Sequence, residues 1–270
     1  MSYPQIIYGT AWKEERTAEL VELALASGFI GLDTAAQPKH YQEDLVGAAL
    51  KNALRAGMSR DSLFIQTKFT PLDGQDSRVP YDMNAPLPTQ VRQSCENSLL
   101  NLGVDFIDSY LLHGPYSHPG LISSDWQVWK EMESLHDEGR VGVIGISNVN
   151  SQQLTSLIEQ ARVKPSFVQN RCYASRGWDH EVRAICSKFG VIYQGFSLLT
   201  ANPKVVHSET VRQISESLGK TPQQVIYRFA SQLGMIPLCG STNITHMNEA
   251  LTIDTFELTP EEIELIKSVE

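Results

Sequence analysis

Short apolar runs alternate along the chain with longer segments in which apolar residues recur every three or four positions. The runs are rich in β-branched and aromatic residues, as buried strands are, and the longer segments have the period of amphipathic helices. The runs with this strand composition are residues 6–8, 29–33, 64–68, 106–113, 143–147, 167–170, 191–195 and 235–238. Their alternation with helical segments predicts a parallel sheet with crossover helices.

Helical period is clearest in residues 17–27, 41–54 and 125–139. Four glycines fall just before predicted strands, where a left-handed helix end favours a residue without Cβ: Gly28, Gly103, Gly139 and Gly190. Eight β-α units without a linker predict a single-domain (β/α)8 TIM barrel over residues 1–270. A doubly wound open α/β sheet is the alternative, but a strand after every helix leaves few helices to cover two sheet edges.

Composition narrows the function classes. The 270 residues are 41% hydrophobic, enough for one large core, and the net charge of -9 disfavours nucleic-acid or anionic-membrane partners. Four scattered cysteines have neither zinc-site nor disulfide spacing, so no metal is expected: Cys95, Cys172, Cys186 and Cys239. Because the chain shows no secretory leader and no long apolar span, we expect a cytoplasmic protein. The sequence carries no signal for an oligomeric state.

Ionisable residues stand at the ends of three predicted strands. Asp33, Lys68 and His113 end their runs, and Tyr41 lies in the loop that follows Asp33. Singly, each has an ordinary interpretation: the Asp as a cap, the Lys as a solvated end and the His as a structural residue. Lys68 and His113, however, end otherwise apolar runs, and barrel enzymes carry reactive groups at the carboxyl ends of their strands. The sequence therefore predicts four ionisable groups in one pocket.

These four side chains fit proton donation. A nearby ammonium, that of Lys68, would lower the pKa of Tyr41, and the Asp33 carboxylate would keep a buried Lys68 charged. His113 would donate a hydrogen bond that orients a substrate oxygen. The prediction is a proton donor aimed at an oxygen that gains negative charge.

The ordered motifs GTAW at 9–12, GLDTA at 31–35, QTKF at 66–69 and LGVDFIDSYLLHGP at 102–115 are followed by GRVGVIGISNV at 139–149, VQNRCY at 168–173 and GKTPQQVIYRFA at 219–230. With them the chain resembles the aldo-keto reductases over nearly its whole length. The resemblance implies an NAD(P)H-dependent enzyme of EC 1.1.1 type that reduces an aldehyde or ketone, a small-molecule carbonyl substrate, to an alcohol. It makes Tyr41 the general acid of a catalytic tetrad with Asp33, Lys68 and His113.

The same resemblance implies the cofactor contacts. Gly9, Thr10 and Ala11 belong to the first motif, Ser147, Asn148 and Gln169 match positions that bind the nicotinamide carboxamide, Phe196 matches a stacking aromatic residue, Ser197, Leu198 and Leu199 match the pyrophosphate segment, and Gly240, Ser241, Thr242, Asn243 and His246 match the adenosine-phosphate segment. Ser, Asn and Gln carry the donors and acceptors that an amide needs, although taken alone they also suit turns. No GxGxxG motif follows a strand, so a Rossmann domain is not expected.

Two departures from the family pattern affect ligand selection. Gly240 stands where a Lys is common, and His246 stands near the position of an Arg; such cations select a 2'-phosphate. We still expect NADP(H) rather than NAD(H), because Ser241, Asn243 and backbone amides remain. Gly114 replaces a common Trp, which opens the substrate pocket that Trp12, Tyr41 and His113 are expected to line. Trp126 and Trp178 are further candidates for that pocket, although Trp126 has the period of a packed helix face.

The spacing between Asp33 and Tyr41 is eight positions, against five in the commoner family pattern. We expect Gln37, Pro38 and Lys39 to bulge outward, with Pro38 fixing the turn and a helix starting at Tyr41. Two alternatives to a reductase remain open. One is a non-catalytic nicotinamide-binding regulatory subunit on the same barrel, and the other is an aldolase in which Lys68 forms a Schiff base.

Overall fold

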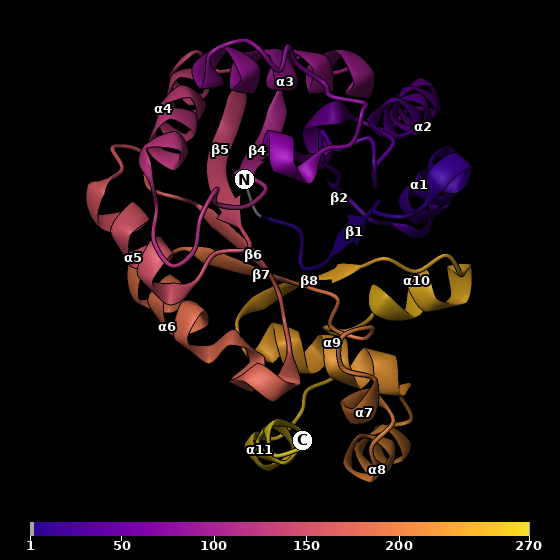
Figure 1. Cartoon of the computed structure of the whole chain (residues 1–270). Coiled ribbons are helices and arrows are strands. Elements are labelled where there is room, and N and C mark those ends of the chain that lie inside the picture. The colour runs from indigo at the N-terminus through magenta and orange to yellow at the C-terminus, as the bar shows by residue number, and fades with distance from the viewer. Residues whose placement is uncertain (1–2, 270) are drawn as a thin grey trace.

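Eight parallel strands pair in chain order and close into a barrel in the computed structural model, which describes residues 3–269 (Figure 1). The strands are β1 (Ile7–Gly9), β2 (Gly31–Asp33), β3 (Phe64–Phe69), β4 (Ile107–Leu112), β5 (Val141–Ser147), β6 (Phe167–Arg171), β7 (Ile192–Phe196) and β8 (Met235–Cys239). Closure comes from the pairing of Ile7 with Leu238 between β1 and β8. The predicted (β/α)8 barrel is confirmed, and the open sheet is excluded.

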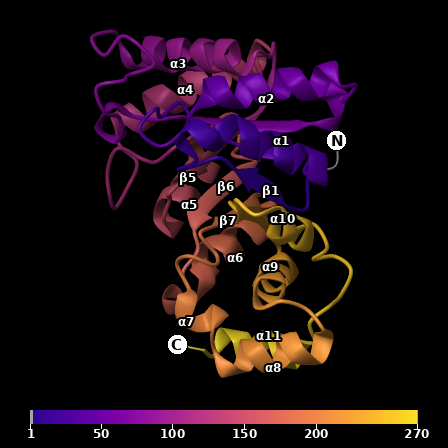
Figure 2. The ribbon, with the colours of Figure 1, turned by 90° about the vertical axis from the view of Figure 1, so that its right-hand side faces the viewer.

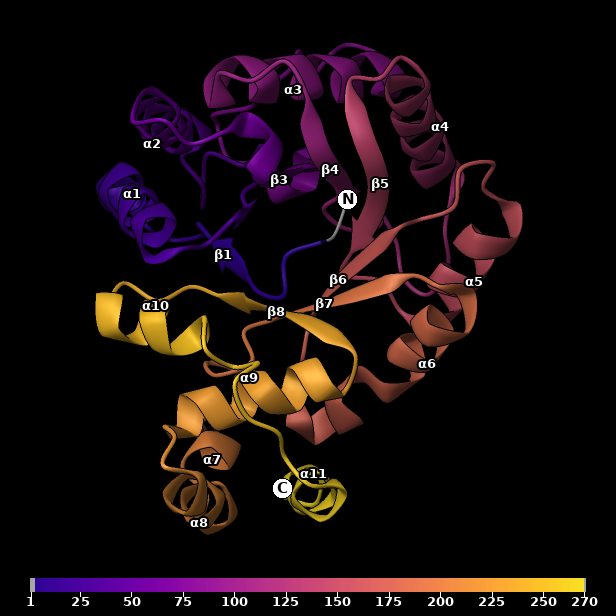
Figure 3. The ribbon, with the colours of Figure 1, turned by 180° about the vertical axis from the view of Figure 1, so that it is seen from behind.

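Helices form the outer ring, as Figures 1 and 3 show from opposite sides. They are α1 (Thr17–Ser27), α2 (Glu43–Arg55), α3 (Leu87–Leu102), α4 (Ser123–Asp137), α5 (Ser151–Gln160), α6 (His180–Phe189), α7 (Pro203–Val206), α8 (Glu209–Leu218), α9 (Pro222–Gln232), α10 (Ile244–Ala250) and α11 (Pro260–Lys267). Short 3-10 turns lie at Glu14–Arg16, Arg60–Ser62, Leu72–Gly74 and Ala174–Asp179. In Figure 2, α8 and α11 lie together at the end of the molecule farthest from α3.

Local sequence signals fix most helix ends. Gly28, Gly103 and Gly190 cap α1, α3 and α6 in the left-handed conformation, and Gly139 is left-handed just beyond α4, as predicted. The predicted start of a helix at Tyr41 is wrong. The helix α2 begins at Glu43, because residue 41 belongs to a turn in which the Tyr41 and His40 backbone amides both donate to the Gln37 carbonyl.

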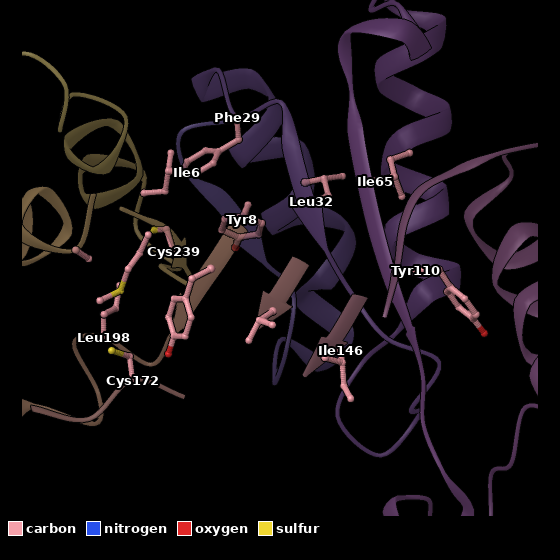
Figure 4. Packing of buried hydrophobic residues seen from close by; sticks show 14 of the residues in the cluster. Ile6, Tyr8, Phe29, Leu32, Ile65, Tyr110, Ile146, Cys172, Leu198 and Cys239 are labelled. Carbon is pink, nitrogen blue, oxygen red and sulfur yellow. The ribbon is translucent and has the colours of Figure 1, made fainter. Parts of the chain in front are cut away.

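The main core fills the space between the strands and the helices. Figure 4 shows part of it, including Tyr8, Leu32, Ile65, Tyr110 and Ile146 from successive strands, all fully buried. A second, smaller cluster fills the barrel interior, and its buried members are Ile7, Phe64, Leu111, Phe167 and Leu238. The rings of Phe64 and Phe167 are covered by Tyr3, whose centroid lies 5.8 Å and 4.9 Å from theirs. Apolar packing therefore closes the barrel at the end where the strands begin.

The described residues contain neither a membrane-spanning helix nor a cluster of metal ligands. Within residues 3–269 the helices are too short or too polar for any of them to traverse a bilayer. In the same span no group of three or more His, Cys, Asp or Glu side chains is arranged to hold a metal ion. All four cysteines are buried free thiols.

Candidate active site

A cavity of about 430 Å³ opens at the carboxyl ends of the strands. The predicted residues that line it are Gly9, Ala11, Trp12, Asp33, Tyr41, His113, Ser147, Gln169, Phe196, Ser197, Leu198, Leu199, Gly240, Ser241 and His246. It therefore extends from the predicted tetrad to the predicted phosphate segment. Four predicted cofactor residues are not in its wall: Thr10, Asn148, Thr242 and Asn243.

Three of these four side chains form hydrogen bonds within the protein, and the fourth is exposed to solvent. Thr10 is buried, and its hydroxyl donates to the Asp33 backbone carbonyl at 3.0 Å. Asn148 lines a neighbouring groove, and its Nδ2 donates to the His113 carbonyl at 2.8 Å. Asn243 caps α10, where its side chain accepts from the backbone amide of Thr245 at 2.8 Å, and Thr242 is exposed beside it. None of the four lies in the cavity wall, and their role as cofactor contacts stays a prediction.

Lys68 and Asp33 form a buried ion pair beneath the cavity. Lys68 is fully buried, and its Nζ donates to both Asp33 carboxylate oxygens, at 2.7 and 2.8 Å. The third ammonium hydrogen goes to the backbone oxygen of Thr34 at 2.7 Å. Burial lowers the pKa of Lys68, and the Asp33 carboxylate opposes that change. The predicted role of Asp33 in keeping Lys68 charged is thus matched by direct contact.

A buried amide network surrounds the Asp33 carboxylate. Asp33 Oδ1 also accepts from Nε2 of Gln66 at 2.7 Å and from Nε2 of Gln169 at 2.9 Å. Gln194 accepts from both of these amides at 2.7 and 2.9 Å and returns a bond to Gln66 Oε1 at 3.0 Å, which Ser109 also reaches at 2.9 Å. Each of the three amide nitrogens in this layer donates at least one hydrogen bond, as buried polar groups require.

Tyr41 stands over this layer between the Lys and the His. Its ring centroid lies 5.3 Å from Lys68 Nζ and 6.0 Å from the ring centroid of His113. The expected lowering of the Tyr41 pKa is wrong: burial, and then the Asp33 carboxylate, raise this pKa. The physical reason is that burial removes the water that would stabilise the phenolate, and the Asp33 carboxylate repels its negative charge. Tyr41 therefore keeps its proton at neutral pH.

His113 is held from both sides. Its backbone amide donates to the Phe69 carbonyl at 2.9 Å, and its ring Nδ1 lies 2.7 Å from the hydroxyl of Thr70. Burial lowers the pKa of His113 to about 3, helped by Lys68 and His40. The imidazole is therefore neutral at pH 7 and has one donor and one acceptor nitrogen.

The loop after β2 does not bulge as expected. Gln37 is buried and its Nε2 donates to the Gly74 carbonyl at 2.6 Å, so its predicted outward placement is wrong. Lys39 is exposed, and Pro38 is half-buried. The loop is fixed further where the Trp12 amide donates to the His40 carbonyl at 2.8 Å. These contacts let eight positions connect Asp33 to Tyr41 within one rigid turn.

The three tryptophans considered for the substrate pocket lie in different environments. Trp12 is 67% exposed at the cavity mouth and packs on His40 with ring centroids 3.8 Å apart. Trp126 packs against the main core, as its helical period indicates. Trp178 is 1% exposed and packs on Phe229 at 4.9 Å, so it is a core residue rather than a pocket wall.

Several wall residues were missed at the sequence level. Lys13 follows the GTAW motif directly, and its Nζ donates to the backbone oxygen of Gly240 across the cavity edge. The other missed side chains include Gln37, His40, Thr200, Gln223, Gln224, Tyr227, Cys239 and Glu249. The glutamines of β3 and β7 did carry a signal, since each interrupts an apolar strand.

Comparison with known proteins agrees with this geometry. The model of the Aldo/keto reductase family matches residues 5–270. The chain is 30% identical to the (1S)-1,7-diacetoxy-luvungin A aldo-keto reductase of Citrus sinensis, with 99% of this chain and 86% of that protein covered. It is also 30% identical to an aldo-keto reductase of Mycolicibacterium smegmatis, over 100% of this chain and 90% of the relative. The solved aldose reductase from Schistosoma japonicum superposes with a TM-score of 0.82 at 28% identity, covering 99% of this chain and 89% of that one. The chain therefore belongs to the aldo/keto reductase family of oxidoreductases.

Proposed function

We propose that this protein reduces an aldehyde or ketone to an alcohol, with NADP(H) as its cofactor and Tyr41 as the proton donor. The observation that carries the proposal is the position of Tyr41 in the cavity, over the buried pair of Lys68 and Asp33 and beside neutral His113. When bound, a reduced nicotinamide supplies a hydride to the carbonyl carbon. The chain's own residues then have to orient the substrate and supply the proton.

Four side chains share that work. Neutral His113 donates a hydrogen bond that holds the carbonyl oxygen, and protonated Tyr41 gives its proton to the same oxygen as negative charge develops there. The phenolate that remains is disfavoured by burial, and the Lys68 ammonium, 5.3 Å from the ring, offsets part of that cost. Asp33 keeps that ammonium charged and fixed in place.

The donor set at the cavity wall fits a nicotinamide. Gln169 uses its Nε2 on Asp33 and Gln194, so its Oε1, which has no hydrogen bond to the described residues, is the group left to accept from a carboxamide. Half-buried Phe196 offers an aromatic face in the same wall. These residues are proposed to bind the ring, and Ser197 to Leu199 the pyrophosphate.

Lys13 supports NADP(H) over NAD(H). Gly240 leaves the chain without a lysine before Ser241, but the ammonium of half-buried Lys13 lies at the Gly240 carbonyl. An ammonium there is a charge-assisted donor for a 2'-phosphate. Lys13→Gln should raise the Kd of NADPH about tenfold more than that of NADH, as expected when one charged hydrogen bond is lost. Lys39→Gln, an exposed lysine outside the wall, is the control in a fluorescence titration, and equal weakening of both cofactors would contradict the assignment.

Tyr41→Phe tests the proton donor. The variant should keep its Kd for NADPH and lose carbonyl turnover by about 10²- to 10⁴-fold, the usual contribution of a positioned acid. The measurement is the decay of NADPH absorbance with a panel of aldehydes and ketones, and Tyr173→Phe, outside the cavity, is the matched control. If Tyr41→Phe reduces a good substrate at the parent rate, the proposed role of Tyr41 is wrong.

The alternatives have less physical support. A Schiff base needs an accessible, neutral amine, whereas Lys68 is fully buried and all its hydrogens are bonded. A non-catalytic subunit leaves the convergence of Asp33, Tyr41 and His113 on one cavity unexplained. A cytoplasmic location is proposed from the four free thiols, which suit a reducing compartment.

A further inference from the structure

Thr70 lies directly after β3, outside the cavity wall, and touches the back of the His113 ring. Its hydroxyl is 2.7 Å from Nδ1, so Nδ1 is turned toward Thr70 and Nε2 is the nitrogen left for a ligand in the cavity. Thr70 is 3% exposed. A neutral imidazole holds its proton on only one nitrogen, so the direction of this single hydrogen bond decides what Nε2 can do.

The position of Thr70 is closely fixed by its surroundings. Its backbone oxygen accepts from the Tyr81 hydroxyl at 2.8 Å and from Gln75 Nε2 at 3.2 Å. Its methyl carbon packs on Gly74, where an added Cβ would lie only 2.8 Å away. The side chain therefore has little freedom to turn its hydroxyl oxygen away from the His113 ring.

The donors and acceptors available to Thr70 and His113 determine the direction of the hydrogen bond between them. Among residues 3–269, the Thr70 hydroxyl has His113 Nδ1 as its sole hydrogen-bond partner. If Nδ1 carried the proton, the buried Thr70 hydroxyl hydrogen would have no acceptor, and an unsatisfied buried donor is unfavourable. If the hydroxyl donates to Nδ1, both groups are satisfied and the proton lies on Nε2.

We propose that Thr70 is a positioning residue that fixes His113 as the Nε2–H tautomer, so that the ring presents a hydrogen-bond donor to the substrate oxygen. The Asn148 amide, bonded to the His113 carbonyl at 2.8 Å, holds the backbone of the same residue. The catalytic consequence rests on the proposed function, because it matters only if a carbonyl oxygen binds there. The tautomer itself does not depend on that function.

The test compares Thr70→Val, which keeps the shape of the side chain without its hydroxyl, with Thr70→Ser, which keeps the donor. Long-range ¹H–¹⁵N spectra of the histidine rings report the tautomer, and loss of one signal set in His113→Gln assigns His113 among the seven histidines. The parent and Thr70→Ser should show Nε2–H, and Thr70→Val should show a mixture or Nδ1–H. A parent Nδ1–H tautomer, or an unchanged pattern in Thr70→Val, would overturn the proposal.

Kinetics separate positioning from a merely structural role. Thr70→Val should lower kcat/KM for a carbonyl substrate about tenfold while the Kd of NADPH stays unchanged, and Thr70→Ser should restore the parent value. A Thr70→Val enzyme with parent kcat/KM would also count against the proposal. If no variant, the parent included, reduces any carbonyl, the proposed function fails, while the ring spectra still decide the tautomer.

Discussion

The buried carboxyl group of Glu43 should make the stability of the protein depend on pH. Glu43 is the first residue of α2 and is 5% exposed, and its carboxylate accepts from the hydroxyls of Thr67 and Ser98. Burial raises the pKa of Glu43 from 4.5 to about 7, although those hydrogen bonds and Lys68 oppose the change. The carboxyl group therefore binds a proton more tightly in the folded protein than in the unfolded chain.

The pH dependence of the free energy of unfolding follows from the difference in proton binding between the folded and unfolded states. Between pH 4.5 and pH 7 the folded state binds more protons at Glu43 than the unfolded state does, so this contribution to stability is full below pH 4.5 and is lost as pH rises through about 7. At about 1.4 kcal/mol per pH unit, the interval between those values corresponds to about 3 kcal/mol. His113 acts oppositely: its pKa is lowered from 6.5 to about 3, so its contribution is lost as pH falls through that range.

Because the contributions of Glu43 and His113 to the pH dependence of stability oppose each other in the parent protein, a variant of Glu43 has to be compared with the parent at each pH. Glu43→Gln resembles the protonated carboxyl and does not ionise. Its free energy of unfolding relative to the parent should increase by about 3 kcal/mol between pH 4.5 and pH 8. Urea unfolding followed by tryptophan fluorescence measures this, with Asp44→Asn on the exposed face of the same turn as the baseline for a change in net charge. A difference that does not vary with pH would refute the reasoning.

Three further substitutions, two of them with a comparison variant, test the core and the ion pair, all by urea unfolding. Lys68→Met leaves the buried Asp33 carboxylate without its cation and should lower the free energy of unfolding by about 3–5 kcal/mol, whereas Asp33→Asn combined with Lys68→Met should lower it less. Trp129→Ala removes a side chain that is 2% exposed and should lower it by about 3–5 kcal/mol, whereas Trp12→Ala, at 67% exposure, should change it by less than about 1 kcal/mol. Gly47→Ala should destabilise the protein by about 1–3 kcal/mol despite better helix propensity, because the new Cβ would lie 2.0 Å from a backbone oxygen of α3; a stabilised variant would show that α2 and α3 can separate.

The barrel was predictable because its signals are local and repeated. Each strand is a short apolar run, and glycines mark several helix ends, so chain order was enough to predict a closed parallel sheet. Strand limits were less predictable, since they depend on pairing. The run 29–33 begins with Phe29, yet β2 begins only at Gly31, because Phe29 still bonds back to Ala24 at the end of α1.

The convergence of the four predicted catalytic residues on one pocket was predictable, whereas several of their neighbours in the structure were not. Asp33 and Lys68 lie at the carboxyl ends of β2 and β3, His113 directly follows β4, and a barrel brings strand ends together whatever the loops do. Thr70 and Lys13 were missed because their roles depend on contacts with residues 43 and 227 positions away in the chain. The raised pKa of Tyr41 was missed because the sequence does not show how deeply the loop after β2 buries the phenol.

The barrel interior explains why the site tolerates such a buried charge pair. Its lower layer is apolar, whereas its upper layer consists of Asp33, Lys68 and three glutamines bonded to one another. An ionised pair in an apolar layer would carry a large desolvation cost, but here Asp33 Oδ1 accepts from two amides as well as the ammonium. Those bonds come from β3 and β6, which are fixed by the sheet. The strands therefore hold the charges of Asp33 and Lys68. The loops need only place Tyr41 over this pair and Thr70 beside His113.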